Sequence, residues 1–260
     1  EQILTGIGTD SYTTQIKNIR TGARQWAAED MSRLPNPDSN TTITLSMLQQ
    51  SGFVKKNLYN PRTKELFPSD LEIVIEEKNG TFIYYVGSES DGKLNPNAPR
   101  ISIVGDSLVY VEQNSSFTDP GVIVKDGNGN VIGSPVLTTR IRDSQGNIIG
   151  SIPVSTIGTY SITYSATLNA IVAKTTRTVI VEDTTPPILN IPSDISIGQN
   201  ITTFDFMNGV SATDDSPVFI SIKTNLTLGI PGKYIVAYTA TDSSGNQTVK
   251  DREVTIRFGN

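Results

Sequence analysis

Acidic side chains are the residues in this sequence whose type and spacing come nearest to a metal site. Asp214 and Asp215 are adjacent, and Asp242 lies further along the chain. Carboxylate oxygens are the ligands that Ca²⁺ prefers, so these three residues are a calcium candidate, although they lack the dense spacing of a dedicated calcium-binding loop. The chain has no Cys and no His, which excludes disulfides, thiolate chemistry and histidine-based zinc or acid–base sites. We expect no other metal and no cofactor.

The composition argues against nucleic acid, a membrane span and catalysis. The net charge of −5 is spread evenly along the chain, so no basic patch is available to bind phosphates. No stretch approaches the roughly 18 apolar residues of a membrane helix. Hydrolysis by paired carboxylates requires two acids that flank a cleft, whereas Glu76 and Glu77 are sequence neighbours, and no nucleophile elbow occurs. We therefore expect no catalytic residues and no enzyme.

A ten-residue phrase occurs twice, as GTYSITYSAT at 158–167 and as GKYIVAYTAT at 232–241. Its side chains alternate, which is typical of a strand with one dry face and one wet face. We expect its tyrosines to be structural core residues whose hydroxyls find backbone partners, with an aromatic sugar platform as the alternative. These tyrosines are Tyr160, Tyr164, Tyr234 and Tyr238.

The two copies belong to repeated modules of unequal length. The phrases begin 74 residues apart, at 158 and 232, whereas the segments PRISI (99–103) and PILNI (187–191) begin 88 residues apart. The first module therefore holds 14 additional residues. We expect the turns DGNGN (126–130) and DSQGN (143–147) to accommodate them.

Residues 1–34 predict a long amphipathic helix that ends at LPNP (34–37), because two prolines cannot continue it. Trp26 is expected to pack on a sheet of the same domain, with an interaction surface as the alternative. Ile3, Leu4 and Ile7 roughly extend the apolar stripe toward the first residue, where no N-cap occurs. The stripe itself consists of Tyr12, Ile16, Ile19, Ala23, Trp26, Ala27 and Met31.

A strand, a turn of helix and a hairpin are predicted after this helix. The segment TTITLSMLQQSGFV (41–54) predicts a short strand and a helical turn capped by Ser46. Asn79-Gly80 predicts a two-residue hairpin turn, because both positions of that turn need positive φ. The register that follows pairs Ile75 with Tyr84, Ile73 with Val86 and Val74 with Tyr85.

Three domains are predicted, at 1–94, 99–183 and 184–260. The first is α+β, with a long helix on a small antiparallel sheet, and the other two are all-β sandwiches, because short strands alternate with turns every 8 to 12 residues. The polar segment 88–99 contains Gly and Pro and is expected to be a flexible joint. The segment EDTTPP (182–187) carries paired prolines and is expected to be a stiffer one.

Residues 99–260 resemble immunoglobulin-like domains. Tyr164-Ser-Ala166 and Tyr238-Thr-Ala240 are similar to the Tyr-x-Cys pattern of the penultimate strand, with Ala in the Cys position. Together with DTTPP (183–187) and TATDSSGN (239–246), they resemble the bacterial immunoglobulin-like and hyalin-repeat-like domains of surface proteins. The resemblance implies two sandwiches. The first copy departs from it after Thr167, where LNAIVAK replaces DSSGN.

Residues 1–94 resemble the soluble part of a type IV pilin or pseudopilin of the clostridial, Gram-positive kind. The resemblance rests on the helix with Tyr12, Ile16, Ile19 and Trp26, then ITLSMLQQSGFVKKNLYNPRTKE, then the hairpin NGTFIYYV. It implies a minor pilin of the bacterial surface that projects two immunoglobulin-like domains near the pilus tip as an adhesin or spacer.

The implied partners are other pilin subunits through the N-terminal helix, and a host or surface ligand through the immunoglobulin-like domains. No nucleic-acid partner is expected. Contact with a membrane would occur only through a segment missing from this chain, expected as about 20 more apolar residues before Glu1. The alternatives are a pseudopilin of a secretion or DNA-uptake machine, and a surface-anchored carbohydrate- or protein-binding module.

Overall fold

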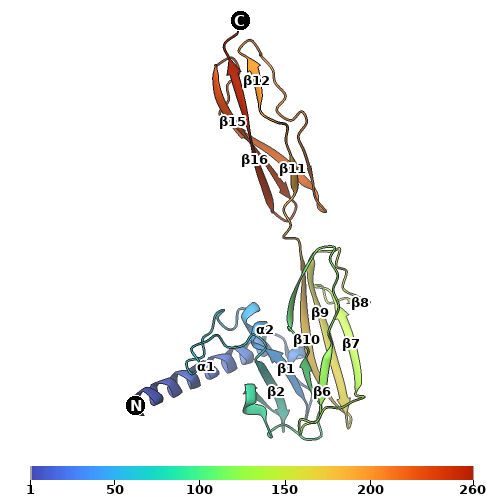
Figure 1. Ribbon diagram of the computed structural model, residues 1–260. Helices are drawn as coiled ribbons and strands as arrows, with labels where there is room; N and C mark the ends of the chain where they lie inside the picture. Colours follow the sequence, from blue (N-terminus) through green and yellow to red (C-terminus); the bar gives the residue numbers. More distant parts are fainter. Residues whose placement is uncertain (1, 260) are drawn as a thin grey trace. The chain divides into compact units, whose positions relative to one another are not determined.

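The computed structural model describes residues 2–259, with side chains from residue 11 onward. The chain divides into two compact units, Glu1–Glu182 and Asp183–Asn260, drawn in Figure 1. The first unit contains both the predicted α+β region and the first predicted sandwich. Its helical elements are α1 (Gln2–Glu29), η1 (Met31–Arg33), α2 (Leu45–Gln50) and η2 (Gly87–Ser90).

A mixed sheet in the order β3-β2-β1-β10-β9-β7-β8 runs through the first unit, and β5 also pairs with β10. Strands β4 and β6 form a separate two-stranded sheet. The strands are β1 (Asn40–Thr44), β2 (Glu72–Lys78), β3 (Thr81–Val86), β4 (Arg100–Ile103), β5 (Leu108–Glu112), β6 (Val122–Lys125), β7 (Val136–Arg142), β8 (Ile148–Ile149), β9 (Gly158–Leu168) and β10 (Ile171–Glu182).

Helix α1 buries its apolar stripe against β1, β2 and β3, as its periodicity predicts. Trp26 is 8% exposed and belongs to this core. Met31 was expected in the stripe, but it is 69% exposed. The helix ends at Glu29, because Asp30 adopts an extended conformation and accepts a hydrogen bond from the backbone N–H of Ser32, which starts a separate 3₁₀ turn. The side chains of Ile3, Leu4 and Ile7 lie outside the described residues.

The hairpin of β2 and β3 has the predicted register, with Ile75 opposite Tyr84 and Ile73 opposite Val86. Its turn residues Asn79 and Gly80 both have positive φ, at 52° and 78°. The predicted cap of α2 is wrong. Thr44 occupies the N-cap position, and the hydroxyl of Ser46 instead contacts the hydroxyls of Thr44 and Ser107.

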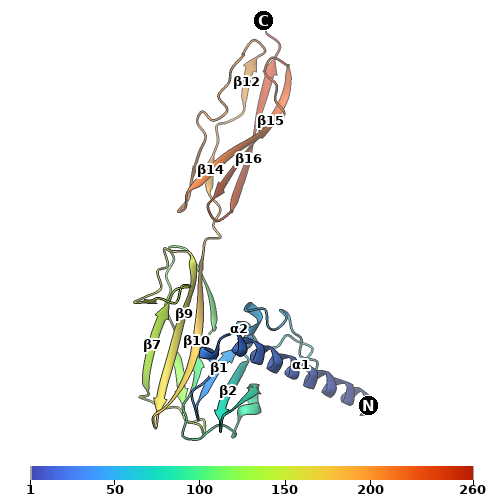
Figure 2. The ribbon, with the colours of Figure 1, turned by 180° about the vertical axis from the view of Figure 1, so that it is seen from behind.

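Segment 88–99 is not a flexible joint, because the regions on its two sides share one sheet. Strand β1 pairs in parallel with β10, with Thr42 opposite Thr175, whose hydroxyl donates to the Thr42 carbonyl at 2.7 Å. Both views of the ribbon place β1 beside β10 (Figures 1 and 2). Arg100 adds an ion pair to Glu72 at 2.5 Å. Backbone pairing of this kind cannot be recognised from the Gly and Pro content of the connecting segment.

In the first sandwich, strands β4 and β6 pack on the sheet that contains β5, β10 and β9, because Ile101 of β4 and Val124 of β6 share one core with side chains of those strands. The core between them contains side chains from both layers, among them Tyr160 of β9. These buried residues are Ile101, Val111, Val124, Tyr160, Ile162, Tyr164, Ala166, Ala173, Val179 and Val181. The apolar positions of β9 and β10 alternate with polar ones, as a half-buried strand requires.

The second unit repeats this arrangement with two sheets, β12-β16-β15-β14 and β11-β13. Leu189, Val236, Tyr238, Ala240 and Val254 form its core. The strands are β11 (Ile188–Asn190), β12 (Ile195–Gly198), β13 (Ser211–Thr213), β14 (Val218–Thr224), β15 (Gly232–Asp242) and β16 (Gln247–Arg257). Strand β12 pairs in parallel with β16, as β5 does with β10.

The 14 additional residues of the first sandwich lie where the two turns predict them. In the pairing registers, Val124 corresponds to Ala212 and Leu137 to Ile220. Leu137 lies 13 positions after Val124 in the first sandwich, whereas Ile220 lies eight positions after Ala212 in the second. Five additional residues of the first sandwich therefore fall between Val124 and Leu137, around 126–130. The remaining nine fall between β7 and β9, around 143–147.

Candidate metal centre

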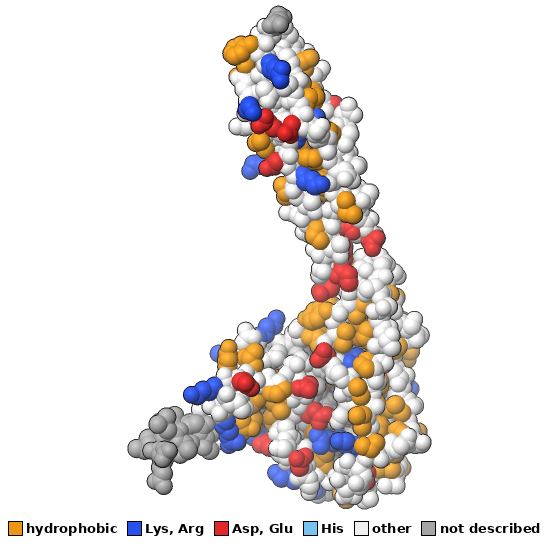
Figure 3. Space-filling model, viewed as in Figure 1, with side chains coloured by type: hydrophobic (Ala, Val, Ile, Leu, Met, Phe, Trp, Pro, Cys, Tyr) orange, Lys and Arg blue, Asp and Glu red, His pale blue; other side chains and the backbone are white. Residues whose placement is uncertain are grey.

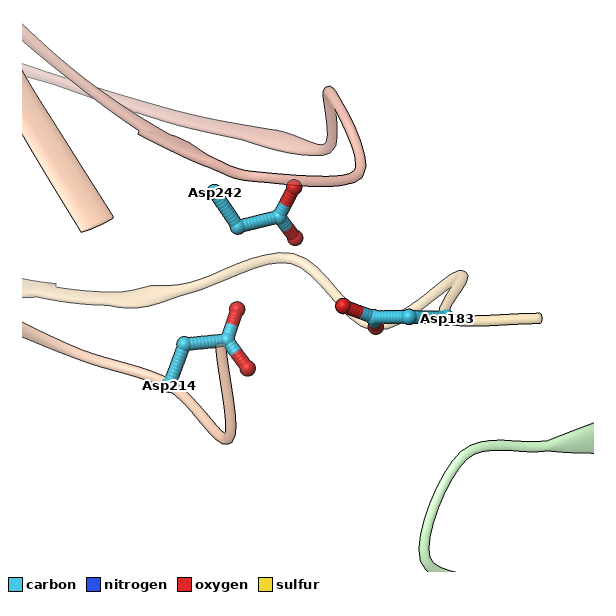
Figure 4. A group of neighbouring side chains, drawn as sticks. All are labelled: Asp183, Asp214 and Asp242. Atoms are coloured by element: carbon cyan, nitrogen blue, oxygen red, sulfur yellow. The ribbon is translucent and has the colours of Figure 1, made fainter. Parts of the chain in front are cut away.

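Three aspartates gather at one end of the second unit, each at the end of a strand. Asp183 directly follows β10, Asp214 directly follows β13, and Asp242 is the last residue of β15. One carboxylate oxygen from each lies within 4.8 Å of the other two. Figure 4 shows the three carboxylates turned toward a common space. Asp183 and Asp242 are 9% and 6% exposed, so two of the three charges are largely withdrawn from solvent.

Asp242 is held by the turn that it opens. Its Oδ1 accepts hydrogen bonds from the backbone N–H groups of Ser244 and Asn246, both at 2.8 Å, and its Oδ2 accepts from the Asn246 side chain at 2.8 Å. Burial acts to raise the pKa of Asp242, but the hydrogen bonds from Asn246, Ser244 and Gly245 outweigh it and hold that pKa below its ordinary value. The carboxyl is therefore ionised at neutral pH.

Asp183 is tied to the same turn. Its Oδ2 accepts a hydrogen bond from the Ser244 hydroxyl at 3.1 Å, and its backbone carbonyl accepts one from the Asn246 side chain at 3.0 Å. Its Oδ1 accepts from the backbone N–H of Thr185 at 3.1 Å. The Asn246 amide therefore connects Asp183 to Asp242.

Asp214 is only partly satisfied. Its Oδ1 accepts a hydrogen bond from the backbone N–H of Asp215 at 2.5 Å. Its Oδ2 is buried and has no hydrogen-bond partner. The hydroxyl oxygen of Ser216, two residues further on, is also buried without a hydrogen-bond partner. An unsatisfied buried oxygen is rare in proteins, so this loop is the anomalous part of the cluster.

The structure assembles two of the three residues in the sequence-based calcium candidate. Asp215 is exposed and lies outside the group, and Asp183 takes the third place. The sequence analysis places Asp183 only in the proline-rich joint at 182–187. For Asp214 and Asp242 the sequence does contain a signal, the repeated tripeptide Ala-Thr-Asp at 212–214 and 240–242, which places an acid at the end of each of two strands. The sequence does not show that the chain entering the unit passes between these two strand ends.

The first sandwich lacks this cluster although it contains the same type of turn. The turns 126–130 and 143–147 share the pattern Asp-x-x-Gly-Asn with 242–246 and form the same three hydrogen bonds to their aspartates. By the repeat spacing, however, the positions of Asp183, Asp214 and Asp242 correspond to Asn95, Asp126 and Leu168. Only one of the three is acidic there.

The tyrosines of the repeated phrase lie in the two sandwich interiors to different degrees. Tyr160, Tyr164 and Tyr238 are buried, at 5%, 2% and 0% exposed, whereas Tyr234 is half-buried. Tyr160 donates its hydroxyl to the carbonyl of Thr156 at 2.9 Å, and Tyr234 donates to that of Ile230 at 3.0 Å. In both cases the acceptor lies four residues earlier. The four rings do not form an exposed sugar platform.

Two surface features bear on the other sequence-based expectations. On the face shown in Figure 3, basic and acidic side chains are interspersed over the first unit. In the part of the chain that the structure describes, no helix has both the length and the apolar character needed to cross a bilayer. The absence of a nucleic-acid partner and of catalysis remain predictions.

The comparisons with known proteins bear mainly on the first sandwich. Residues 101–181 match the family described as "Bacterial surface protein, Ig-like domain", which confirms the immunoglobulin-like prediction for that region. A search of curated proteins finds no match.

Several solved structures are similar at low TM-scores, which carry no functional argument. The chain resembles the structure of "CBM51-2 in complex with GlcNAc and INT domains from Clostridium perfringens ZmpB" at 25% identity and a TM-score of 0.24, over 28% of this chain and 17% of that one. It resembles the lipoprotein BT2262 from Bacteroides thetaiotaomicron at 17% identity and a TM-score of 0.27, over 59% of this chain and 78% of that one. It resembles human mucin-like protocadherin EC1-2 at 11% identity and a TM-score of 0.25, over 62% of this chain and 99% of that one.

Proposed function

We propose that this chain is a non-enzymatic subunit of the bacterial cell surface, a minor type IV pilin whose two sandwiches project from the pilus as an adhesin or spacer. The observation that carries the proposal is the course of α1. Its 28 residues correspond to about 42 Å of helix. Its described apolar side chains, from Tyr12 to Ala27, pack on β1, β2 and β3. The ribbon of its N-terminal turns extends beyond that sheet (Figure 1).

A helix that extends beyond its own domain can pack against helices of other subunits, as a fibre core requires. The match of residues 101–181 to a family of bacterial surface proteins supports an extracellular location. The sheet shared by β1 and β10 supports a projecting role, because it joins the helix-bearing region to the first sandwich without a flexible joint. Anchoring the helix in a fibre would then set the direction of that sandwich.

The test is recovery of the protein with sheared pili. In cells that produce the chain from its native gene, antibody detection should find it in the sheared pilus fraction, and a strain without the major pilin should lose that signal. A variant without residues 183–260 is the matched control, because it keeps the proposed assembly region and should still enter the pilus fraction. Equal surface signal with and without the major pilin would refute the pilin assignment and leave a surface protein anchored by other means.

A carbohydrate-binding surface module is the second candidate, favoured by a polar cavity of about 330 Å³ in the first unit. Its lining includes Gln49, Asp70, Asp106 and Ser107, whose hydrogen-bonding groups suit a sugar. A glycan array probed with the full chain tests this function. Saturable binding that Gln49→Ala abolishes would support it, and an array without signal would exclude it for the sugars tested.

A further inference from the structure

The aspartate cluster of the second unit carries an uncompensated negative charge. Three carboxylates meet within 4.8 Å, and two of them are at least nine-tenths buried. In the described part of the chain, no Lys or Arg side chain forms an ion pair with any of the three. Like charges brought together away from water destabilise a fold, so a cation bound among the three carboxylates would stabilise this arrangement.

The unsatisfied oxygen of Asp214 is a second observation on this cluster, and it concerns hydrogen bonding where the first concerns charge. Its Oδ2 is removed from solvent and accepts no hydrogen bond, while the side chain points toward Asp183 and Asp242 (Figure 4). A buried polar atom without a partner costs free energy that folding would have to offset. A cation between the three side chains would satisfy this oxygen and balance the charge together.

The chemistry of the cluster selects the cation. The donors are carboxylate oxygens only, and the chain has no Cys or His, so a hard cation fits better than zinc. The separation of up to 4.8 Å is about twice the Ca²⁺–oxygen bond of roughly 2.4 Å, whereas Mg²⁺ demands bonds of about 2.1 Å and near-ideal octahedral geometry.

We propose that Asp183, Asp214 and Asp242 bind one Ca²⁺ ion that ties together the end of the second unit. Asp214 follows a strand of the β11-β13 sheet, Asp242 ends a strand of the β12-β16-β15-β14 sheet, and Asp183 is the first residue of the unit. The ion therefore connects the two layers of the sandwich with the entering chain. In a unit of 78 residues without disulfides, it provides the cross-link that a small core lacks.

The proposal is tested by calorimetric melting of the full chain in EDTA and in Ca²⁺ up to 10 mM, a range that covers the dissociation constants of about 10⁻⁴ to 10⁻³ M of extracellular calcium modules. We expect Ca²⁺ to raise the melting temperature of the transition that belongs to the second unit and to leave the other transition unchanged, because the ion binds only the folded cluster. Mg²⁺ at the same concentration should give a smaller rise.

Asp214→Asn separates this proposal from a purely structural role. In EDTA the variant should melt at or above the wild-type temperature, because it removes one of three repelling charges, and in Ca²⁺ it should lose the rise. Asp126→Asn is the matched control, because Asp126 occupies the corresponding place in the first sandwich, and it should keep the calcium response of the second unit.

Direct binding gives a second readout. Isothermal titration calorimetry of the full chain with Ca²⁺ should show one site, and Asp183→Asn should weaken it by about tenfold or more, because one of three charged ligands is lost. A second-unit transition that does not respond to Ca²⁺, or an Asp214→Asn protein that responds like wild type, would overturn the proposal.

Discussion

Tyr164 donates its hydroxyl hydrogen to the carboxylate of Asp119, with both carboxylate oxygens 2.6 Å from the hydroxyl oxygen. The same carboxylate pairs with Nε of Arg177 at 3.2 Å. Tyr238 occupies the corresponding place in the second sandwich, but its hydroxyl donates to the backbone carbonyl of Phe206 at 2.8 Å. The repeat thus keeps the tyrosine and changes its acceptor from a charged group to a neutral one.

Removal of the two hydroxyls should therefore have unequal effects. Tyr164→Phe should cost about 1.5–3 kcal/mol, because the lost bond has a charged acceptor, and Tyr238→Phe about 0.5–1.5 kcal/mol. Replacement of either residue by Ala should cost about 3 kcal/mol or more, since a large buried ring is lost. Urea denaturation of the four variants measures these free energies of unfolding. Equal losses in the two Phe variants would contradict the distinction.

Tyr164 should also ionise at unusually high pH. Burial is the main cause, partly opposed by the hydrogen bond from Arg177 and reinforced by Asp119, and the pKa rises from 10.0 to about 12. Because the folded pKa lies above the unfolded one, the stability it contributes is fully present below pH 10 and is lost as the pH rises toward 12. An alkaline absorbance titration of wild type against Tyr164→Phe should show one tyrosine ionising near pH 12. A difference titration centred near 10 would contradict this.

Arg177 and Arg252 provide a matched pair for buried charge. In the strand registers Arg177 lies opposite Ile162 and Arg252 opposite Val236, which are corresponding positions of the repeat. Arg177 is fully buried and donates to the carbonyls of Val104, Asp106 and Gly121, whereas Arg252 donates through Nε to that of Ser193.

Arg177→Met should therefore cost about 3–5 kcal/mol, because it removes the guanidinium that donates to three backbone carbonyls and is the cationic partner of the Asp119 carboxylate. Arg252→Met should cost less. Urea titration of both variants decides the order, and a larger loss for Arg252→Met would refute it.

The shared sheet predicts two unfolding transitions in calorimetry, one for residues 1–182 and one for 183–260, not the three expected from the predicted domains. Gly127→Ala tests the coupling across segment 88–99. A Cβ at Gly127 would lie 2.1 Å from the carbonyl oxygen of Asn95, so the variant should lower the first transition alone. Gly133→Ala is the control, because a Cβ there meets nothing within 4 Å. A third transition in wild type would show that the two regions unfold separately.

Local patterns predicted the elements well because neighbouring residues determine them. The turn Asn79-Gly80 set the register of its hairpin, and the repeat arithmetic located the additional residues of the first sandwich. The prediction failed where distant segments meet. The pairing of Thr42 with Thr175 joins residues 133 positions apart, and the sequence of neither strand indicates which strand it pairs with.

The candidate site, too, was predicted where local sequence determines it and missed where distant segments meet. Asp214 and Asp242 stand at recognisable strand ends, but the inclusion of Asp183 depends on where β10 delivers the chain. The buried guanidinium of Arg177 was also missed, because an arginine within an alternating strand has the same pattern as a solvent-facing one.

The parallel pairing of the last strand in each unit determines how a pulling force would be resisted. Strand β10 pairs in parallel with β5 over Thr178–Glu182 and Leu108–Glu112, and β16 pairs in parallel with β12. Tension on the chain beyond Glu182 slides β10 lengthwise past β5, so the hydrogen bonds between them are loaded in shear and must break together. An adhesin under flow would experience such a load, and its lifetime would depend on the rate of forced unfolding.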